Sequence, residues 1–158
     1  IVDYVSKNPE FELHIAGFGQ LEGEIRSAAE KFKNVIYYGK LSYPDALCLE
    51  SQCNIMTSIY DPSIANHKYV ASNKFYEAMM LGKPLIMVHN TGLDKVLDDN
   101  NIGATIEYSE AGFGEGVSRI VKNKNNWPAE SKKMKQIFLS KYSWNIMEKK
   151  LLEIYSSI

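Results

Sequence analysis

Residues 72–86 read SNKFYEAMMLGKPLI, and this stretch contains two elements that decide the fold prediction. Ser72 is a residue type that caps the start of a helix. Gly82, followed closely by a proline, is typical of a helix end. The apolar run at 85–88 is long enough for a buried strand. The stretch therefore predicts a helix over 73–81 that leads directly into a strand.

Outward from this stretch, short apolar runs alternate with segments of helical periodicity. Strands are predicted at 11–16, 35–38, 54–59, 85–88 and 104–106, and helices at 1–8, 20–32, 42–52, 73–81, 92–97, 111–124, 128–141 and 143–157. This alternation is typical of βαβ units with parallel strands. We therefore expect an α/β fold: a Rossmann-like parallel sheet of about five or six strands, with helices on both faces and a C-terminal helical tail.

Composition narrows the class of protein. A chain of 158 residues suffices for one domain with a single core, and a net charge of -1 gives no nucleic-acid footprint. Two cysteines, Cys48 and Cys53, predict no disulfide framework and fit a reducing cytoplasm. No run approaches the ~20 apolar residues of a membrane span. We expect a cytoplasmic protein, either free or held peripherally on the inner face of the membrane.

In an open parallel sheet, ligands bind outside the carboxyl ends of the strands. Four segments are predicted at that edge: Gly17–Gly19, Gly39–Leu41, the polar loop 60–72, and the turn after His89. The loop and the helix after it are the most informative, because the free N–H groups of a helix start favour an anion.

Charged side chains near this helix start suit a nucleotide. Lys74 adds a positive charge in the first turn, and Glu77 lies about 6 Å further along the axis from Asn73. A carboxylate at that distance suits ribose hydroxyls while the amide groups hold a diphosphate. The alternatives are a solvated lysine without a role and an exposed helix glutamate.

Other candidate residues carry weaker signals. Gly17 and Gly19 lack the third glycine of a dinucleotide fingerprint, so they indicate either close approach of a ligand or a simple tight turn. His14, inside a strand, is interpreted as structural. His67, in the polar loop, faces either ligand or solvent. No residues have the arrangement of a catalytic triad or the spacing of a metal site, so we expect neither.

Several of these segments together resemble one family. Residues 72–86 closely resemble the signature of the family 4 (group 1) glycosyltransferases, in which a helix with E-A-M-A-x-G-x-P-V-I follows the donor loop. Residues 13–19 look like the family's L-x-I-x-G-x-G segment, and 35–39 look like V-x-F-x-G. Residues 142–144 and 152–155 look like its F-S-W and L-x-x-I-Y. The match covers nearly the whole chain in order.

The resemblance implies a GT-B enzyme with two Rossmann-like halves that face a cleft. It implies that residues 1–158 are the C-terminal, donor-binding domain and that the N-terminal acceptor domain is absent. The expected donor is a UDP-, GDP- or ADP-sugar, and no other cofactor is expected. The expected acceptor is a glycan or a lipid-linked hydroxyl, as in lipopolysaccharide or capsule synthesis. The family outcome is transfer with retention and without a metal, which this domain alone should not perform.

The resemblance also assigns roles to individual residues. Glu77 matches the family glutamate that holds the ribose. Residues Ala71, Ser72 and Asn73 match the loop that meets the diphosphate and sugar. Residues Gly39, Lys40 and Leu41 match the segment that contacts the base, largely through backbone.

Two departures from the family pattern leave alternatives open. Tyr69 stands where the family often has a first glutamate, eight positions before Glu77, although a subset with N-K-x-x-E also lacks it. The family's basic residues that neutralise the diphosphate come from a turn upstream of this chain. The alternatives are a non-catalytic partner subunit, which Tyr69 favours, and a sugar-nucleotide epimerase of the same architecture.

Overall fold

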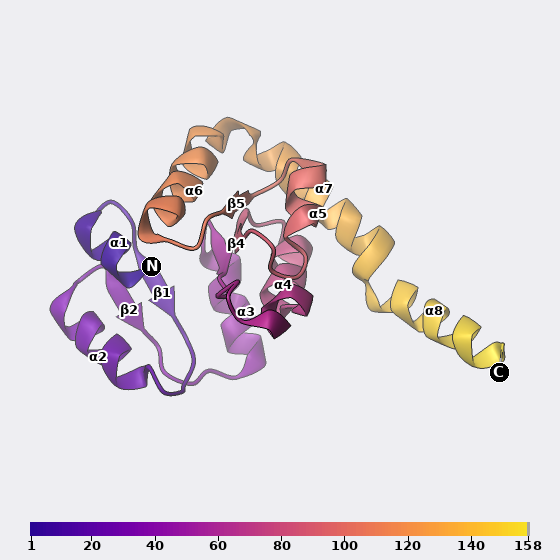
Figure 1. The fold of residues 1–158 in the computed structure, drawn as a ribbon, viewed down its shortest axis with the longest axis horizontal. Coiled ribbons are helices and arrows are strands. Elements are labelled where there is room, and N and C mark those ends of the chain that lie inside the picture. The colour runs from indigo at the N-terminus through magenta and orange to yellow at the C-terminus, as the bar shows by residue number, and fades with distance from the viewer. Residues whose placement is uncertain (158) are drawn as a thin grey trace.

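The computed structural model describes residues 1–157, in which helices and short parallel strands alternate (Figure 1). The elements in chain order are α1 (Val2–Lys7), β1 (Leu13–Ile15), α2 (Glu22–Lys31), β2 (Val35–Tyr37), α3 (Tyr43–Gln52), β3 (Met56–Ser58), η1 (Ala65–Tyr69), α4 (Asn73–Leu81), β4 (Leu85–Val88), α5 (Asp94–Asn100), β5 (Ala104–Ile106), α6 (Glu110–Lys122), η2 (Lys124–Asn126), α7 (Trp127–Ile137), η3 (Phe138–Tyr142) and α8 (Trp144–Ser156). The α/β class and the helical C-terminal tail are as predicted.

The strands form two small sheets, so the prediction of one continuous sheet is wrong for the described residues. Strands β1 and β2 form one sheet, and β3, β4 and β5 form the other in that order. All pairs are parallel, with Leu13 opposite Val35 and Met56 opposite Leu85. Hydrophobic alternation along the chain predicts strands and their direction, but it does not specify which strands lie side by side.

Helices cover both faces of the three-stranded sheet, and β4 contributes to both core clusters. Leu85 and Met87 face the cluster that includes residues of α4 and α7, whereas Ile86 and Val88 face the cluster with α6. Successive side chains of a strand point to opposite faces, which explains this division. All four residues are buried, as expected for a central parallel strand.

Local signals place the ends of α4 where the sequence predicts them. The Ser72 hydroxyl oxygen accepts a hydrogen bond from the backbone N–H of Lys74 at 3.2 Å. At the other end, Gly82 adopts the left-handed conformation with φ 67°, and its N–H donates to Met79 O at 3.3 Å. The helix is therefore fixed at both ends by its own sequence.

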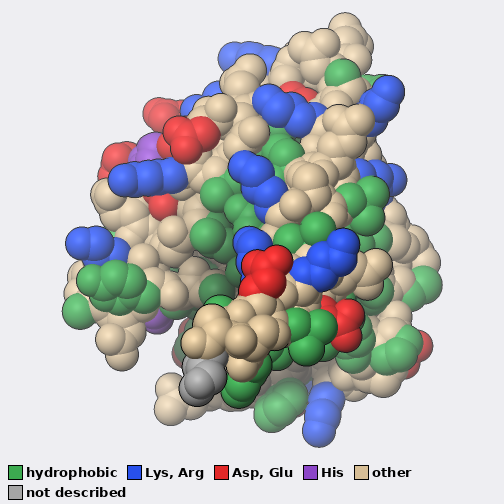
Figure 2. All heavy atoms as spheres, turned by 90° about the vertical axis from the view of Figure 1, so that its right-hand side faces the viewer, with side chains coloured by type: hydrophobic (Ala, Val, Ile, Leu, Met, Phe, Trp, Pro, Cys, Tyr) green, Lys and Arg blue, Asp and Glu red, His purple; other side chains and the backbone are tan. Residues whose placement is uncertain are grey.

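Helix α8 extends away from the body of the molecule after a single π-helical segment, η3 (Figure 1). Several of its large apolar side chains are exposed: Trp144, Leu151, Leu152, Ile154 and Tyr155. On the face toward which α8 points, green hydrophobic side chains lie among lysines and carboxylates (Figure 2). No helix in residues 1–157 combines the length and the apolar character that a membrane crossing requires.

Candidate functional site

The amino end of α4 lies at the carboxyl edge of the three-stranded sheet, because α4 connects two parallel strands, β3 and β4. Ser72 is buried and caps the helix, while Ala71 and Asn73 on either side of it are exposed. The hydroxyl of Tyr60, which follows β3, lies 3.5 Å from the Ser72 hydroxyl. The helix start is thus held against the sheet while its neighbouring residues stay open to solvent.

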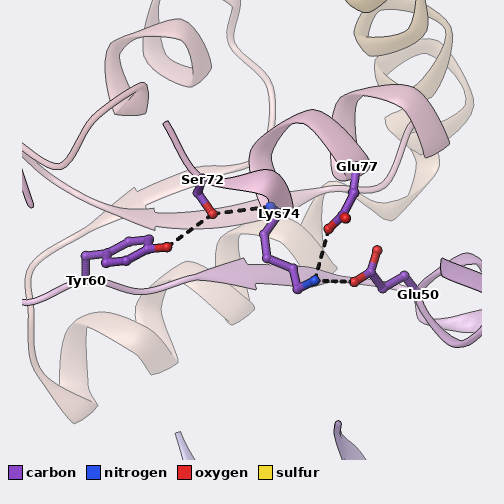
Figure 3. Close-up of polar contacts among 5 residues, drawn as sticks. All are labelled: Glu50, Tyr60, Ser72, Lys74 and Glu77. Carbon is purple, nitrogen blue, oxygen red and sulfur yellow. Dashed lines mark hydrogen bonds and ion pairs between the residues drawn. The ribbon is translucent and has the colours of Figure 1, made fainter. Parts of the chain in front are cut away.

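Three charged side chains meet beside this helix start (Figure 3). The Lys74 Nζ atom lies 2.9 Å from Glu77 Oε2 and 2.5 Å from Oε1 of Glu50, which belongs to α3. The Glu77 side chain is only 7% exposed and that of Glu50 only 14%, whereas the Lys74 side chain is 48% exposed. The ammonium group therefore joins two carboxylates that are largely removed from water.

Burial and charge perturb this cluster in a consistent direction. Burial raises the pKa of Glu50, and the Lys74 ammonium only partly offsets that rise. For Lys74, burial lowers the pKa, but its hydrogen bonds to Glu50 and Glu77 outweigh burial and leave the pKa raised. Burial and then the Glu77 charge raise the pKa of Tyr43 at the start of α3. In this cluster, two carboxyl groups, those of Glu50 and Glu77, share the single ammonium group of Lys74.

The burial of Glu77 rules out the alternative of an exposed helix glutamate. The residue is 5% exposed, and Glu50 of α3 binds the same Lys74 ammonium that Glu77 contacts. Lys74 likewise is not a free cation, since both carboxylates bind it. The side chains lie at the predicted edge, and they contact each other.

The two glycine segments of the smaller sheet lie together at their own carboxyl edge. The Gly17 N–H donates to Gly39 O at 2.8 Å, and the Tyr37 hydroxyl donates to Gly17 O at 2.7 Å. In residues 1–157, apart from the adjoining residues, no atom lies within 4 Å of an added Cβ at Gly17, Gly19 or Gly39, so this backbone is open to approach. The exposed Lys40 ammonium lies 5.0 Å from the ring centre of Phe18. Leu41, half-buried, leads from this segment into α3 and its Tyr43.

The loop 60–72 contains the short 3₁₀ helix η1, which the sequence did not predict. His67 Nδ1 contacts Asp61 O at 2.8 Å, and its ring packs edge-on against Tyr60, so this side chain serves the loop itself. Tyr69, at the position of the family's first glutamate, is 80% exposed. The end of this loop lies against the turn that follows β4. A Cβ added to Gly92 in that turn would lie 2.0 Å from Val70 O, so this position requires glycine.

Sequence reasoning missed Glu50 and Tyr43. Their helix, α3, carries a correct start signal, because the Ser42 side chain accepts a hydrogen bond from the Asp45 N–H. Nothing in the sequence marks Glu50, however, because its contact with Lys74 spans 24 positions and joins two helices. Glu50 is identified as part of the site only by the three-dimensional structure, because no local sequence motif contains it.

The arrangement suits recognition of an anion beside a hydroxylated ring. The helix dipole at the start of α4 and the Lys74 ammonium favour negative charge, while the N–H groups of Lys74 and Phe75 already donate to Ser72. The Glu77 carboxylate, one turn further, has the acceptor oxygens that vicinal hydroxyl groups require. Which of the predicted residues contact a ligand stays a prediction.

Comparison with known structures supports the fold. The chain is 24% identical to the protein in a crystal structure of TarM and matches it with a TM-score of 0.69. The match covers 95% of this chain but 30% of the TarM chain, so the chain spans less than a third of that protein. A comparison with curated protein sequences found no match.

The family comparison covers most of the chain. The profile of a family described as "Glycosyl transferases group 1" matches residues 1–123, which include both sheets, α4 and the cluster around Lys74. Because this match extends over well more than half of the residues, the chain belongs to the group 1 glycosyltransferases.

Proposed function

We propose that this chain is the donor-binding domain of a glycosyltransferase that moves a sugar from a nucleoside diphosphate sugar to a hydroxyl acceptor. The observation that carries the proposal is the start of α4, where a Ser72 cap, the Lys74 ammonium and a buried Glu77 carboxylate follow one another within about one and a half turns. Family membership supports the reaction class.

In this proposal, each group at the start of α4 has one role. The amide groups near Ala71, Ser72 and Asn73 hold the diphosphate, and Glu77 accepts hydrogen bonds from the ribose. Gly39, Lys40 and Leu41 contact the base, because this segment leads directly into α3, whose Glu50 and Tyr43 lie beside Glu77. As the glycosidic bond breaks, the leaving diphosphate gains charge, and the helix start and Lys74 stabilise it.

Transfer with retention, without a metal ion, is part of the proposal and rests on the family resemblance. The acceptor, a glycan or lipid-linked hydroxyl, would bind a second domain across a cleft. The chain alone is therefore proposed to bind the donor and transfer nothing. The short coverage of the TarM chain leaves ample length in such a protein for a second domain.

The two small sheets support a contribution from elsewhere in the parent protein. Strand β1 pairs only with β2, and β3 only with β4, among the described residues. A further parallel strand between β1 and β3 would produce the Rossmann order 3-2-1-4-5-6, with β2, β1, the added strand, β3, β4 and β5 in sequence. We propose that a segment outside residues 1–158 supplies it.

Calorimetry with UDP-glucose, GDP-mannose and ADP-glucose tests donor binding in the protein that contains this chain. We expect one of the three to bind, and Glu77→Gln to weaken that binding roughly 10- to 100-fold, because a charged acceptor of ribose hydroxyls is lost. Glu30→Gln, on the exposed side of α2, is the matched control and should bind like the wild type.

Two results would contradict this proposal. One is failure of the wild-type protein to bind any nucleotide sugar. The other is an equal loss of affinity in Glu77→Gln and Glu30→Gln, since the loss would then not depend on the site.

A further inference from the structure

The Glu50 carboxyl group has no role in the proposed reaction, yet it is the most unusual group near the site. Its Oε1 contacts the Lys74 ammonium, while its Oε2 is buried and has no hydrogen-bond partner among residues 1–157. A buried acceptor without a partner is costly, so such atoms in proteins usually have an explanation. The groups that face Glu50 are Tyr43 and Cys53 from α3 and its end, and Lys74 and Glu77 from α4.

In this geometry, the Lys74 ammonium cannot bind Glu50, Glu77 and a diphosphate at the same time. Its Nζ lies 2.9 Å from Glu77 Oε2 and therefore occupies one of the two oxygens that a ribose diol would use. A diphosphate at the start of α4 would bring two negative charges to the first turn, where Lys74 is located. The Lys74 side chain is half-exposed and can reach solvent on that side, whereas the two carboxylates are largely buried.

We propose that donor binding moves the Lys74 ammonium from Glu50 and Glu77 to the diphosphate, and that a proton from solvent replaces it on the Glu50 carboxyl. One proton is taken up for each donor bound, and no other bond changes. Glu50 is thus a positioning residue: it holds Lys74 in the free protein and becomes a neutral acid in the complex. This inference rests on the proposed function, because it requires a nucleotide sugar at α4.

The choice of Glu50 over Glu77 as the proton acceptor follows from their surroundings. Glu77 gains ribose hydroxyl donors in the complex, which replace the ammonium group as its hydrogen-bond partners. Glu50 gains no donor and loses Lys74, its one cationic partner among the described residues, while it stays buried beside a second carboxylate. The rise that burial already causes in the pKa of Glu50 would increase further.

The direction of the pH effect follows from this exchange. The complex binds one proton more than the free protein at pH values between the Glu50 pKa of the free state and the higher Glu50 pKa of the complex. Affinity therefore falls as pH rises through that window, by up to tenfold per pH unit. A nucleotide sugar is the correct probe, because its diphosphate, unlike that of a free nucleoside diphosphate, has no ionisation near neutral pH.

Calorimetry in two buffers of different ionisation enthalpy measures the proton directly. UDP-glucose, GDP-mannose and ADP-glucose are titrated at one pH in each buffer, and the enthalpy difference gives the protons taken up. We expect uptake of up to one proton in the wild type and in Glu30→Gln. Glu50→Gln, which has the same shape as glutamate but cannot titrate, should bind the same sugar without uptake.

A second measurement detects the protonated carboxyl group itself and does not rely on the heat of binding. In infrared difference spectra, a carboxylic acid C=O band should appear when the wild type binds the nucleotide sugar, and Glu50→Gln should lack it. In Lys74→Met, which has no ammonium to hold the carboxylate, the same band should be present before any ligand is added.

Each contrary outcome has a distinct meaning. Binding with no buffer dependence and no acid band overturns the proton exchange and leaves the proposed function intact. Uptake that survives in Glu50→Gln but disappears in Glu77→Gln overturns the assignment to Glu50. Absence of binding by the wild type overturns the proposed function and this inference together.

Discussion

Ser72 and Ser143 occupy equivalent places before helices, but only Ser72 uses its side chain as a cap. Its hydroxyl accepts from the Lys74 N–H, whereas the Ser143 hydroxyl donates backward to Leu139 O at 3.0 Å. Ser72→Ala should therefore lower the free energy of unfolding by about 1 kcal/mol, and Ser143→Ala by less than about 0.5 kcal/mol. Urea denaturation of both variants measures this difference. Equal effects would show that the Ser72 cap contributes nothing.

The candidate site shows which residues a sequence can reveal. Ser72, Lys74 and Glu77 lie within six positions, and their helical spacing specifies how they are arranged, so their proximity was predictable. Their exposure was not predictable, because the burial of Glu77 depends on how the chain packs and not on helical spacing. Glu50 was unpredictable for the same reason, because a contact between two helices leaves no periodic signal in either.

At the scale of elements, the turn after β4 and the end of the polar loop depend on one glycine. Gly92 has φ 68° and lies against the Val70 carbonyl, and its N–H donates to Lys68 O at 3.3 Å. Gly92→Ala should lower the free energy of unfolding by about 1–3 kcal/mol and shift the loop before α4. Thermal and urea denaturation measure the first effect, and weaker nucleotide-sugar binding would report the second.

Gly23 provides the matched control within the same chain. It lies in α2 with a helical backbone, and no atom lies within 4 Å of an added Cβ. Gly23→Ala should raise the free energy of unfolding by about 0.5 kcal/mol, because alanine favours helix more than glycine does. A destabilising effect of the same size in both variants would contradict the role given to Gly92.

The boundaries of elements were predictable where a cap or a glycine defines them, as at Ser42, Ser72 and Gly82. They were less predictable where the chain depends on packing. The predicted helix at 92–97 begins instead at Asp94. The buried Asp94 carboxylate accepts a hydrogen bond from the Asn90 N–H, which stabilises a turn over 90–93 in place of helix. η1 was missed because 3₁₀ segments of this length have no distinct periodicity.

At the scale of the whole molecule, the two separate sheets lead to a prediction about stability. If a strand from outside residues 1–158 completes the sheet, a longer protein should bury the free edges of β1 and β3. The longer protein should then protect the backbone amides of 13–15 and 56–58 from hydrogen exchange more strongly than this chain alone does. Amides of β5, on the far side of the larger sheet, are the internal control. Unchanged protection at β1 and β3 would contradict the added strand.

The π-helical segment before α8 holds an aromatic contact with a mechanical consequence. Tyr142 packs edge-on against Phe75 and Tyr76, with ring centres 5.5 and 5.6 Å apart, and both partners belong to α4. Glu77 belongs to the same helix. A displacement of the projecting tail would therefore be transmitted to the helix that carries this carboxylate through the three rings.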